Sequence, residues 1–253
     1  MSLVFRRAIV VGASSGVGAE IARQLAASGC AVALLGRREA ELRSVASQIS
    51  ARGQGQAITR VHDVRQHEHV PGLLEELQKE LGGLDLLVYA AGIMNLPREG
   101  EYDAARDRTE LEINLLGAMA WTAPVAAQFE AKRAGTIVAI SSIAGERGRR
   151  TFPAYSTSKA GLTTWMEALR NRVSRYGVNV VTVKPGFMDT AILDQVERKP
   201  KGALLTSPER GAELILQAAR RGGSPSVFVP GIWWGIAMIV RHLPSFVFRR
   251  LNI

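Results

Sequence analysis

Apolar residues along this chain follow two alternating patterns. Short, continuously apolar runs bounded by glycine or polar residues are typical of buried strands, and longer segments with apolar residues every three or four positions are typical of helices. The strand-like runs are residues 6–13, 31–36, 57–64, 84–92, 135–142, 179–186 and 226–231. The helix-like segments between them are residues 19–29, 39–50, 67–81, 104–130, 155–176 and 208–220.

This alternation predicts an α/β fold with a doubly wound parallel sheet of the Rossmann type. Strands that are apolar throughout are buried on both faces, as they are when helices cover both sides of a parallel sheet. No composition shift, internal repeat or low-complexity run divides the chain, and only 94–103 and 191–207 are candidates for long loops. We therefore expect a single domain over residues 1–253, with an apolar and basic C-terminal segment at 231–253.

The composition supports a globular protein in a reducing compartment. The 253 residues are 47% hydrophobic and 22% charged, which excludes a disordered or fibrous chain. The one cysteine, Cys30, excludes a disulfide framework and sits in an apolar run. The first residues contain Arg6 and Arg7 and lack the apolar block of a signal peptide. We expect a cytoplasmic protein.

The formal net charge of +9 predicts an anionic partner. A phosphorylated cofactor, a nucleic acid and an anionic membrane surface would each fit such a charge. No recognition helix or aromatic stacking motif supports nucleic-acid binding, so we expect none. His67 and His69 stand two apart without a nearby cysteine, and a solvated helix start explains them better than a metal site. No metal is expected.

A glycine-rich loop follows the first strand and precedes a helix. Glycines in this context let the backbone approach a pyrophosphate, whose charge is met by the amides at the helix N-terminus. A simple tight turn is the alternative, but the strand before and the helix after favour a dinucleotide site. The residues predicted to bind are Gly12, Ser14, Ser15, Gly16, Val17 and Gly18.

The end of the second strand favours NADP(H) over NAD(H), although NAD(H) stays open. A carboxylate at this point commonly binds a free ribose hydroxyl, but the chain has Gly36 followed by Arg37 and Arg38. The guanidinium of Arg37 is expected to bind a 2′-phosphate through charge-assisted hydrogen bonds, together with Ser14. The alternative is that both arginines begin a solvated helix. At the end of the third strand, Asp63 is placed to meet the adenine ring.

Two groups of side chains predict proton-transfer chemistry. Ser142 ends a strand at the carboxyl edge of the sheet, where ligands bind in such folds. Tyr155 and Lys159 lie at positions i and i+4 of a helix and share one face. An ammonium near a phenol is expected to lower its pKa and make it usable as an acid or base. A surface tyrosine beside a surface lysine is the alternative.

In order and spacing, these motifs resemble those of the short-chain dehydrogenase/reductase family over essentially the whole chain. The residues that carry the resemblance are the loop GASSGVG, Asp63, Asn114, Ser142, Tyr155, Lys159 and the segment Pro185 to Thr190. The resemblance implies an NADP(H)-dependent oxidoreductase that interconverts a ketone and a secondary alcohol, as a homodimer or homotetramer.

The resemblance also implies individual roles. Tyr155 would donate the proton, Ser142 would orient the substrate, and Lys159 would also bind the nicotinamide ribose. Asn114 would hold a water in the proton relay, and Thr190 would contact the nicotinamide carboxamide. The remaining cofactor contacts implied are Val64, Ala91, Gly92, Pro185 and Gly186.

The chain departs from the family pattern at two positions. Val11 stands where a threonine is usual, and Ala90 stands where the family has an asparagine. Replacing both partners of a polar contact by apolar groups can be nearly neutral, whereas replacing one would leave a buried polar group unpaired. We interpret the change as structural.

The loop before Tyr155 carries Arg147, Arg149 and Arg150, which could bind a substrate phosphate near the mouth of the site. A solvated loop or an oligomer contact is the alternative. The stretches AGERGRR and RHLPSFVFRRL resemble the branch that reduces a polyprenylphosphoryl 2-keto-pentose. A reductase of another ketone, such as a 3-oxoacyl, steroid-like or xenobiotic compound, stays open. A non-catalytic nucleotide-sensing regulator is disfavoured because Ser142, Tyr155 and Lys159 are all present.

The C-terminal segment is too interrupted to cross a bilayer, since Pro230, Gly231, Gly235 and Arg241 break its apolar run. Tryptophans flanked by arginines favour an interfacial helix that contacts the inner face of the membrane peripherally. A lid over the substrate pocket and a contact between subunits are the alternatives.

Overall fold

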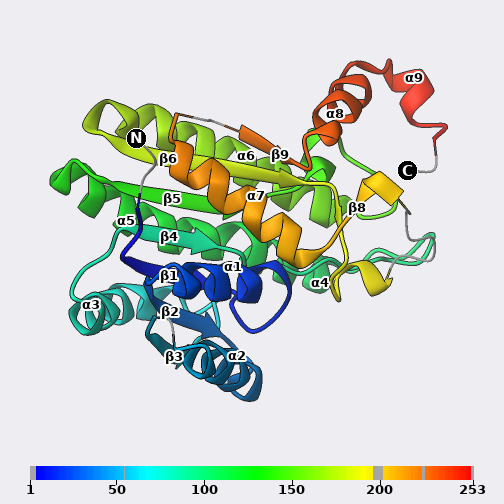
Figure 1. Ribbon diagram of the computed structural model, residues 1–253. Helices are drawn as coiled ribbons and strands as arrows, with labels where there is room; N and C mark the ends of the chain where they lie inside the picture. The colour runs from blue at the N-terminus through cyan, green and yellow to red at the C-terminus, as the bar shows by residue number, and fades with distance from the viewer. Residues whose placement is uncertain (1–3, 54, 196–201, 224–225, 252–253) are drawn as a thin grey trace.

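A seven-stranded parallel sheet forms the centre of the molecule (Figure 1). The computed structural model describes residues 4–53, 55–195, 202–223 and 226–251. The strand order is β3-β2-β1-β4-β5-β6-β9, and every neighbouring pair is parallel. The order reverses between β1 and β4, which is where doubly wound folds open a crevice for a ligand. The predicted fold is confirmed.

The elements have the following bounds. The strands of the main sheet are β1 Arg7–Val11, β2 Ala31–Gly36, β3 Ala57–Val61, β4 Leu86–Tyr89, β5 Gly135–Ile140, β6 Val178–Pro185 and β9 Ser226–Val229, and a small second sheet pairs β7 Phe187–Met188 with β8 Leu205–Thr206. The helices are α1 Gly16–Ala27, α2 Glu39–Ala51, α3 Val70–Leu81, α4 Ala104–Leu111, α5 Gly117–Lys132, α6 Pro153–Val173, α7 Pro208–Arg221, α8 Ile232–His242 and α9 Ser245–Phe248.

Two apolar layers hold the helices to the sheet. Helices α1, α2 and α7 cover one face, and helices α3, α5 and α6 cover the other (Figure 1). Successive residues of strand β1 point to opposite faces of the sheet. Val10 packs in the first apolar layer, with α1, α2 and α7, and Ile9 packs in the second, with α3, α5 and α6. Cys30 is fully buried in the first layer, and burial raises the pKa of its thiol to about 12.

The expectation of one continuous helix over 104–130 is wrong. Helix α4 passes at Glu112–Leu116 into one turn of π-helix before α5 begins at Gly117. Asn114 lies in this turn, and its side chain bonds to the neighbouring Ile93 backbone. Wide turns of this kind are common where a helix passes a functional site.

The 191–207 segment was expected to be a loop, but it contains a short turn at Leu193–Gln195 and strand β8. Residues 196–201 of that expectation lie outside the described residues.

The C-terminal segment forms two helices instead of a single interfacial one. Helices α8 and α9 are separated by Leu243 and Pro244, since a proline ring cannot continue the preceding helix. Both stand beyond the carboxyl end of β9 (Figure 1). Residues 252–253 of the predicted segment are outside the described residues. Within the described part of the chain, no helix combines the length and apolar character needed to cross a membrane.

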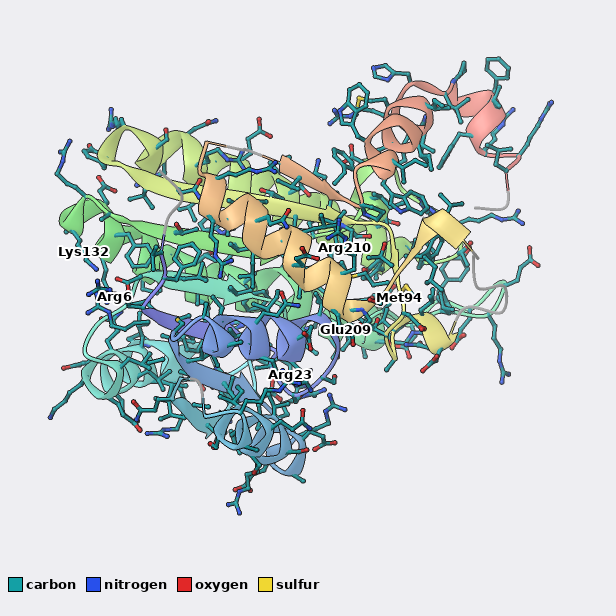
Figure 2. All side chains as sticks on the ribbon, viewed as in Figure 1. Arg6, Arg23, Met94, Lys132, Glu209 and Arg210 are labelled. Carbon is teal, nitrogen blue, oxygen red and sulfur yellow. The ribbon has the colours of Figure 1, made fainter. Side chains whose placement is uncertain are left out.

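The two ends of the sheet differ in character. Arg6 and Lys132 lie at the end where the strands begin, and Met94 lies at the opposite end (Figure 2). Met94 follows β4, and the loops that leave the carboxyl ends of β1, β4 and β5 carry most of the predicted site.

Candidate active site

A cleft of about 420 Å³ opens at the carboxyl edge of the sheet. The predicted residues that line it are Gly12, Ser14, Ser15, Gly16, Val17, Gly18, Arg37, Arg38, Val64, Ala91, Gly92 and Thr190. Lining residues that the sequence did not single out as binding are Gly36, His62, Ala90, Ile93, Met94, Ile113, Ala191, Ile192 and Gln195.

The glycine loop needs its glycines for space. A Cβ on Gly12 would lie 2.4 Å from the Ala91 backbone nitrogen, and one on Gly18 would lie 2.2 Å from the Gly12 carbonyl oxygen. Helix α1 begins at Gly16, and the Ser15 side chain caps none of its amides. First-turn amides left without partners are an anion site. The cleft therefore fits a dinucleotide with its pyrophosphate at the start of α1.

The Arg38 side chain binds the two serines of the glycine loop. Its Nη2 donates hydrogen bonds to Ser14 Oγ at 2.9 Å and to Ser15 Oγ at 2.5 Å. The neighbouring Arg37 is exposed. The pKa of Asp63 is lowered mainly by its hydrogen bond with Arg65, and the charge of Arg37 adds to that lowering. One guanidinium and two hydroxyls thus form a compact cluster at the end of β2, next to a second guanidinium.

The residues predicted to bind the cofactor but absent from the lining of the cleft are Asp63, Lys159, Pro185 and Gly186. The Asp63 carboxylate accepts hydrogen bonds from Arg65, including one from Nη2 at 2.6 Å, and its neighbours line the cleft in its place. Pro185 and Gly186 do not line the cleft, because Gly186 is packed against Trp233. A Cβ at position 186 would lie 1.9 Å from Trp233 Nε1.

Helix α6 and the end of β5 bring the predicted catalytic side chains together. Ser141 Oγ donates to the Lys159 carbonyl at 2.8 Å, which ties the strand end to the helix. Lys159 Nζ donates to the Ile140 carbonyl at 3.0 Å and lies 5.6 Å from the centroid of the Tyr155 ring. Ser142 Oγ accepts from the Ala144 amide at 3.1 Å. The predicted shared face of Tyr155 and Lys159 is confirmed.

The expected lowering of the Tyr155 pKa by Lys159 is wrong for these side chains. Burial raises the pKa of Tyr155 to about 12, and a hydrogen bond with Ser142 offsets only part of that rise. Burial also lowers the pKa of Lys159 to about 8. At neutral pH the phenol therefore holds its proton, which is the state that a proton donor needs.

Asn114 is fully buried and holds two elements together. Its Oδ1 accepts from the Ile93 amide at 2.9 Å, and its Nδ2 donates to the Ile93 carbonyl at 2.9 Å and to Ser158 Oγ at 3.0 Å. These bonds join the loop after β4 to helix α6. The carbonyl group of Ile93 thus lies beside the helix that carries Tyr155 and Lys159.

Glu110 belongs to the same region, although the sequence analysis missed it. Its side chain is buried one helical turn before Asn114, and its charge acts on both Tyr155 and Lys159. The spacing of four from Asn114 on a helix was the available signal.

Val11 and Ala90 occupy the ends of adjacent strands. The Ala90 amide donates to the Val11 carbonyl at 2.8 Å, so the backbone alone joins the two strands there. Both side chains pack against apolar clusters. The apolar pair thus lies where β1 and β4 end, and Ala90 also lines the cleft.

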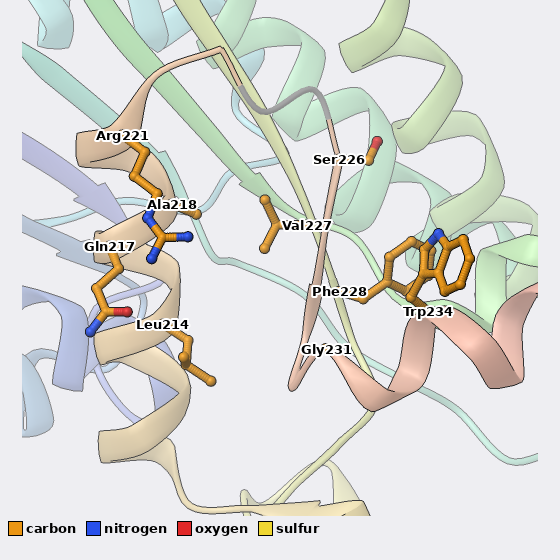
Figure 3. A pocket seen from close by; sticks show the side chains of 9 residues that line it. All are labelled: Leu214, Gln217, Ala218, Arg221, Ser226, Val227, Phe228, Gly231 and Trp234. Carbon is orange, nitrogen blue, oxygen red and sulfur yellow. The ribbon is translucent and has the colours of Figure 1, made fainter.

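A second groove, of about 400 Å³, lies beside the edge strand β9 (Figure 3). Leu214, Gln217 and Arg221 of α7 line one side, and Trp234 of α8 lies on the other (Figure 3). None of its lining residues belongs to the predicted catalytic or cofactor-binding set. The candidate active site is therefore the cleft at the carboxyl edge.

A family model described as short chain dehydrogenase matches residues 6–201 of the chain. The protein belongs to the short-chain dehydrogenase family. An uncharacterized oxidoreductase of Mycobacterium tuberculosis is 30% identical over 238 residues, covering 93% of this chain and 92% of the relative. The ketoacyl reductase HetN of a Nostoc species is 31% identical over 221 residues, covering 87% and 77%.

Among solved structures, an actinorhodin polyketide ketoreductase crystallised with NADPH superposes with a TM-score of 0.79 at 26% identity, covering 90% of this chain and 97% of that one. As a short-chain dehydrogenase, the protein is an oxidoreductase that acts on CH–OH and C=O groups and binds NAD or NADP. The cleft and the catalytic side chains described above fit this chemistry.

Proposed function

We propose that this short-chain dehydrogenase reduces a ketone to a secondary alcohol with NADPH, and that Tyr155 is the proton donor. The observation that carries the proposal is the meeting of Tyr155, Ser142 and Lys159 beside a dinucleotide cleft, with the phenol protonated. Bound nicotinamide supplies the hydride. The Tyr155 hydroxyl gives its proton to the carbonyl oxygen, and the Ser142 hydroxyl donates a hydrogen bond that orients that oxygen.

The other catalytic and cofactor roles follow from the family. Lys159 binds the nicotinamide ribose, Asn114 holds a water that returns the proton to the site, and Thr190 contacts the carboxamide. The burial of Asn114 against Ile93 and Ser158 supports a fixed position for such a water. The position of Thr190 in the cleft, 3.3 Å from a Cβ built on Gly16, supports its role.

The preference for NADPH rests on Arg38, Ser14 and Ser15. Their cluster offers a guanidinium and two hydroxyls to a 2′-phosphate, and Arg37 stands next to it. Position 36 is a glycine, so no carboxylate repels the phosphate there. Charge-assisted hydrogen bonds from arginine to phosphate are among the strong ones in proteins.

The substrate that we propose is bulky and carries a phosphate or lipid, as a polyprenylphosphoryl keto-sugar does. Of the three loop arginines, Arg149 supports this best, because its buried Nε has no hydrogen-bond partner among the described residues. Burial raises the pKa of Tyr155, and the charge of Arg149 offsets part of that rise. Arg147 instead binds the C-terminal segment, where it donates hydrogen bonds to the backbone carbonyls of Val240 and Leu243.

A 3-oxoacyl or polyketide substrate is the second candidate. The relative from Nostoc is named a ketoacyl reductase, and the structural relative is named a polyketide ketoreductase. Such substrates present a ketone on a long flexible chain. They would use the same proton donor without the need for a phosphate at Arg149.

Helices α8 and α9 are proposed to contact an anionic membrane surface peripherally, at the inner face. Their exposed apolar side chains are Ile232, Trp234, Ile239 and Phe246, and exposed arginines stand at 241, 249 and 250. Apolar area together with basic charge is the composition of an interfacial helix. Assembly as a homodimer or homotetramer is proposed from the family.

The substrate proposal is tested by following NADPH oxidation with a polyprenylphosphoryl keto-sugar, a 3-oxoacyl thioester and a neutral cyclic ketone. We expect Arg149→Ala to raise KM for the phosphate-bearing ketone by about tenfold or more and to leave KM for the neutral ketone nearly unchanged. Arg43→Ala is the control, because Arg43 is exposed on α2 and paired with Glu39. Equal losses on all substrates would reject Arg149 as a phosphate ligand.

A further inference from the structure

A buried ion pair lies at the end of the short segment that follows Ser142. Lys184 Nζ, on β6, donates a hydrogen bond to Glu146 Oε1 at 2.6 Å. The Glu146 side chain is 3% exposed and the Lys184 side chain 7%, so the pair is shielded from water. Taking two charges out of water offsets much of the attraction between them, so stability alone does not explain an ion pair in this place.

The segment 141–146 is attached to β6 at both ends. At its start, the Ser141 amide donates a hydrogen bond to the Val183 carbonyl at 2.8 Å. At its other end, Glu146 pairs with Lys184, which directly follows Val183. The chain thus leaves β6 after Ser141 and returns to it at Glu146, and two neighbouring residues of one strand fix the two ends of the turn.

Ser142 stands inside this turn. Its Oγ accepts a hydrogen bond from the Ala144 amide at 3.1 Å, and its carbonyl accepts one from the Gly145 amide at 3.2 Å. Gly145 lies against helix α6, where a Cβ on it would be 2.7 Å from the carbonyl carbon of Lys159. The position of the Ser142 hydroxyl relative to the catalytic face of α6 therefore depends on how the turn is held.

The second oxygen of Glu146 faces helix α8. Arg241 Nε lies 3.5 Å from Glu146 Oε2, but the Arg241 side chain is 56% exposed. An exposed partner contributes little, because water and salt screen its charge. The Lys184 ammonium is buried and also lies 5.5 Å from the centroid of the Phe228 ring. The contact with β6 is therefore the one that fixes the carboxylate.

We propose that Glu146 is a positioning residue for the reaction: through its buried pair with Lys184 it holds the turn on β6, and so holds the Ser142 hydroxyl where it orients the carbonyl oxygen of the ketone. Glu146 acts through Ser142 and does not touch the substrate. The inference rests on the role proposed for Ser142 in ketone reduction. The sequence resemblance named neither Glu146 nor Lys184.

Loss of the pair should affect turnover and spare cofactor binding. With one end of the turn released, the Ser142 hydroxyl leaves the productive position, and small displacements near the reacting atoms cost much in rate. We expect Glu146→Gln to lower kcat about tenfold or more and to leave Kd for NADPH within about twofold. The expected split follows because neither Glu146 nor Lys184 lines the cofactor cleft.

The test is a double-mutant cycle between Glu146 and Ser142. Ketone reduction is measured with a neutral cyclic ketone and NADPH for the wild type, Glu146→Gln, Ser142→Ala and the double variant. Once Ser142→Ala has removed the hydroxyl, Glu146→Gln should lower kcat by no more than about twofold. Equal factors with and without the hydroxyl would overturn the proposal, because a general loosening of the fold acts in both backgrounds. Wild-type kcat in Glu146→Gln would overturn it too.

Asp85→Asn is the matched control. Asp85 pairs with Arg7 at 2.8 Å where β1 and β4 begin, at the end of the sheet away from the cleft. This variant should lower the midpoint of thermal unfolding and keep the kcat of the wild type. A fall in kcat as large as that of Glu146→Gln would assign both losses to stability and reject the positioning role.

A second variant keeps the test decisive if Glu146→Gln does not fold. Removing one partner leaves the other charge buried and unpaired, whereas removing both is tolerated better. Glu146→Gln with Lys184→Met removes both charges and leaves the turn untied. It should show the same fall in kcat and the same dependence on Ser142, and wild-type kcat in it would overturn the proposal.

The cycle also separates this inference from the proposed function. Wild-type kcat in Ser142→Ala alone would reject the role proposed for Ser142, and the inference would fall with it. An impaired Ser142→Ala combined with equal factors for Glu146→Gln in both backgrounds would reject the inference alone and leave the proposed function standing.

Discussion

At the scale of single residues, the preference for NADPH that we propose rests on Arg38 and the serines of the glycine loop. The guanidinium bonds to Ser14 and Ser15 without a carboxylate between them, although Glu41 stands 3.7 Å from its Nη1. A 2′-phosphate adds two formal negative charges to this cluster, whereas a 2′-hydroxyl adds none. The difference between the two cofactors is therefore concentrated on one side chain.

Arg38→Ala should raise KM for NADPH by about tenfold or more, since a charge-assisted contact to phosphate is lost, and should leave KM for NADH within about threefold. Arg37→Ala should have a smaller effect in the same direction. The measurement is steady-state titration of both reduced cofactors with a saturating ketone. An equal loss for NADH and NADPH would mean that Arg38 supports the glycine loop without selecting the phosphate.

The spacing of residues predicted which side chains meet, but it did not predict their pKa values. Tyr155 and Lys159 share a face because they are four apart on a helix, and this was readable from the sequence. Burial raises the pKa of Tyr155 and lowers the pKa of Lys159, and burial is a property that only the packed structure defines. Arg38, not Arg37, reaches the serines for the same reason, since the direction of a side chain depends on the turn at the end of β2.

At the scale of elements, the loop after β5 joins the catalytic site to α8 and α9. Arg147 donates to the carbonyls of Val240 and Leu243, and its guanidinium lies 4.3 Å from the centroid of the Phe248 ring. Glu146 bridges Lys184 at 2.6 Å and Arg241 at 3.5 Å. The C-terminal helices are thus docked on the segment that begins with Ser142.

Arg147→Ala should loosen α8 and α9, because the partly buried carbonyls of Val240 and Leu243 lose a charged donor. Losing such a bond costs about 1.5–3 kcal/mol of local stability. The C-terminal helices should therefore open at least about ten times more often than in the wild type. Limited proteolysis and amide hydrogen exchange across 232–248 measure this directly.

Arg249→Ala is the control for that experiment, since Arg249 is exposed at the end of α9. Its exchange rates should match those of the wild type. If Arg147→Ala also leaves the protection of α8 unchanged, Trp233 packed over Gly186 would be sufficient to hold the segment, and Arg147 would contribute nothing measurable.

Periodicity predicted most of the elements but not their interruptions. The seven strands of the main sheet and the helices that cover it follow from apolar patterns of two kinds, which depend on local sequence. The π-turn at Asn114 depends instead on a side chain that bonds to Ile93, twenty-one residues earlier. A long-range contact of this kind leaves no periodic signal.

At the scale of the whole molecule, the charge of +9 and the exposed apolar side chains of α8 and α9 together predict binding to anionic membranes. We expect the protein to sediment with vesicles containing phosphatidylglycerol at low salt and to be released at high salt, because screening weakens the attraction of exposed charges. Vesicles of phosphatidylcholine alone should bind it weakly.

The matched variant for this experiment is Trp234→Ala with Phe246→Ala, which removes exposed apolar area and leaves the charge unchanged. It should reduce pelleting at every salt concentration. Equal recovery of the wild type in the supernatant with and without anionic lipid would exclude the membrane surface, and the exposed face would then be assigned to another copy of the chain.

The central claim is that a protonated Tyr155 beside a nucleotide cleft makes this protein a ketone reductase. The most direct measurement is ketone-dependent NADPH oxidation by the wild type and by Tyr155→Phe, together with NADPH binding followed by fluorescence. We expect Tyr155→Phe to lose at least about 100-fold in kcat, because only the donated proton is removed, while its Kd for NADPH stays within about twofold. Wild-type turnover in Tyr155→Phe would contradict the account.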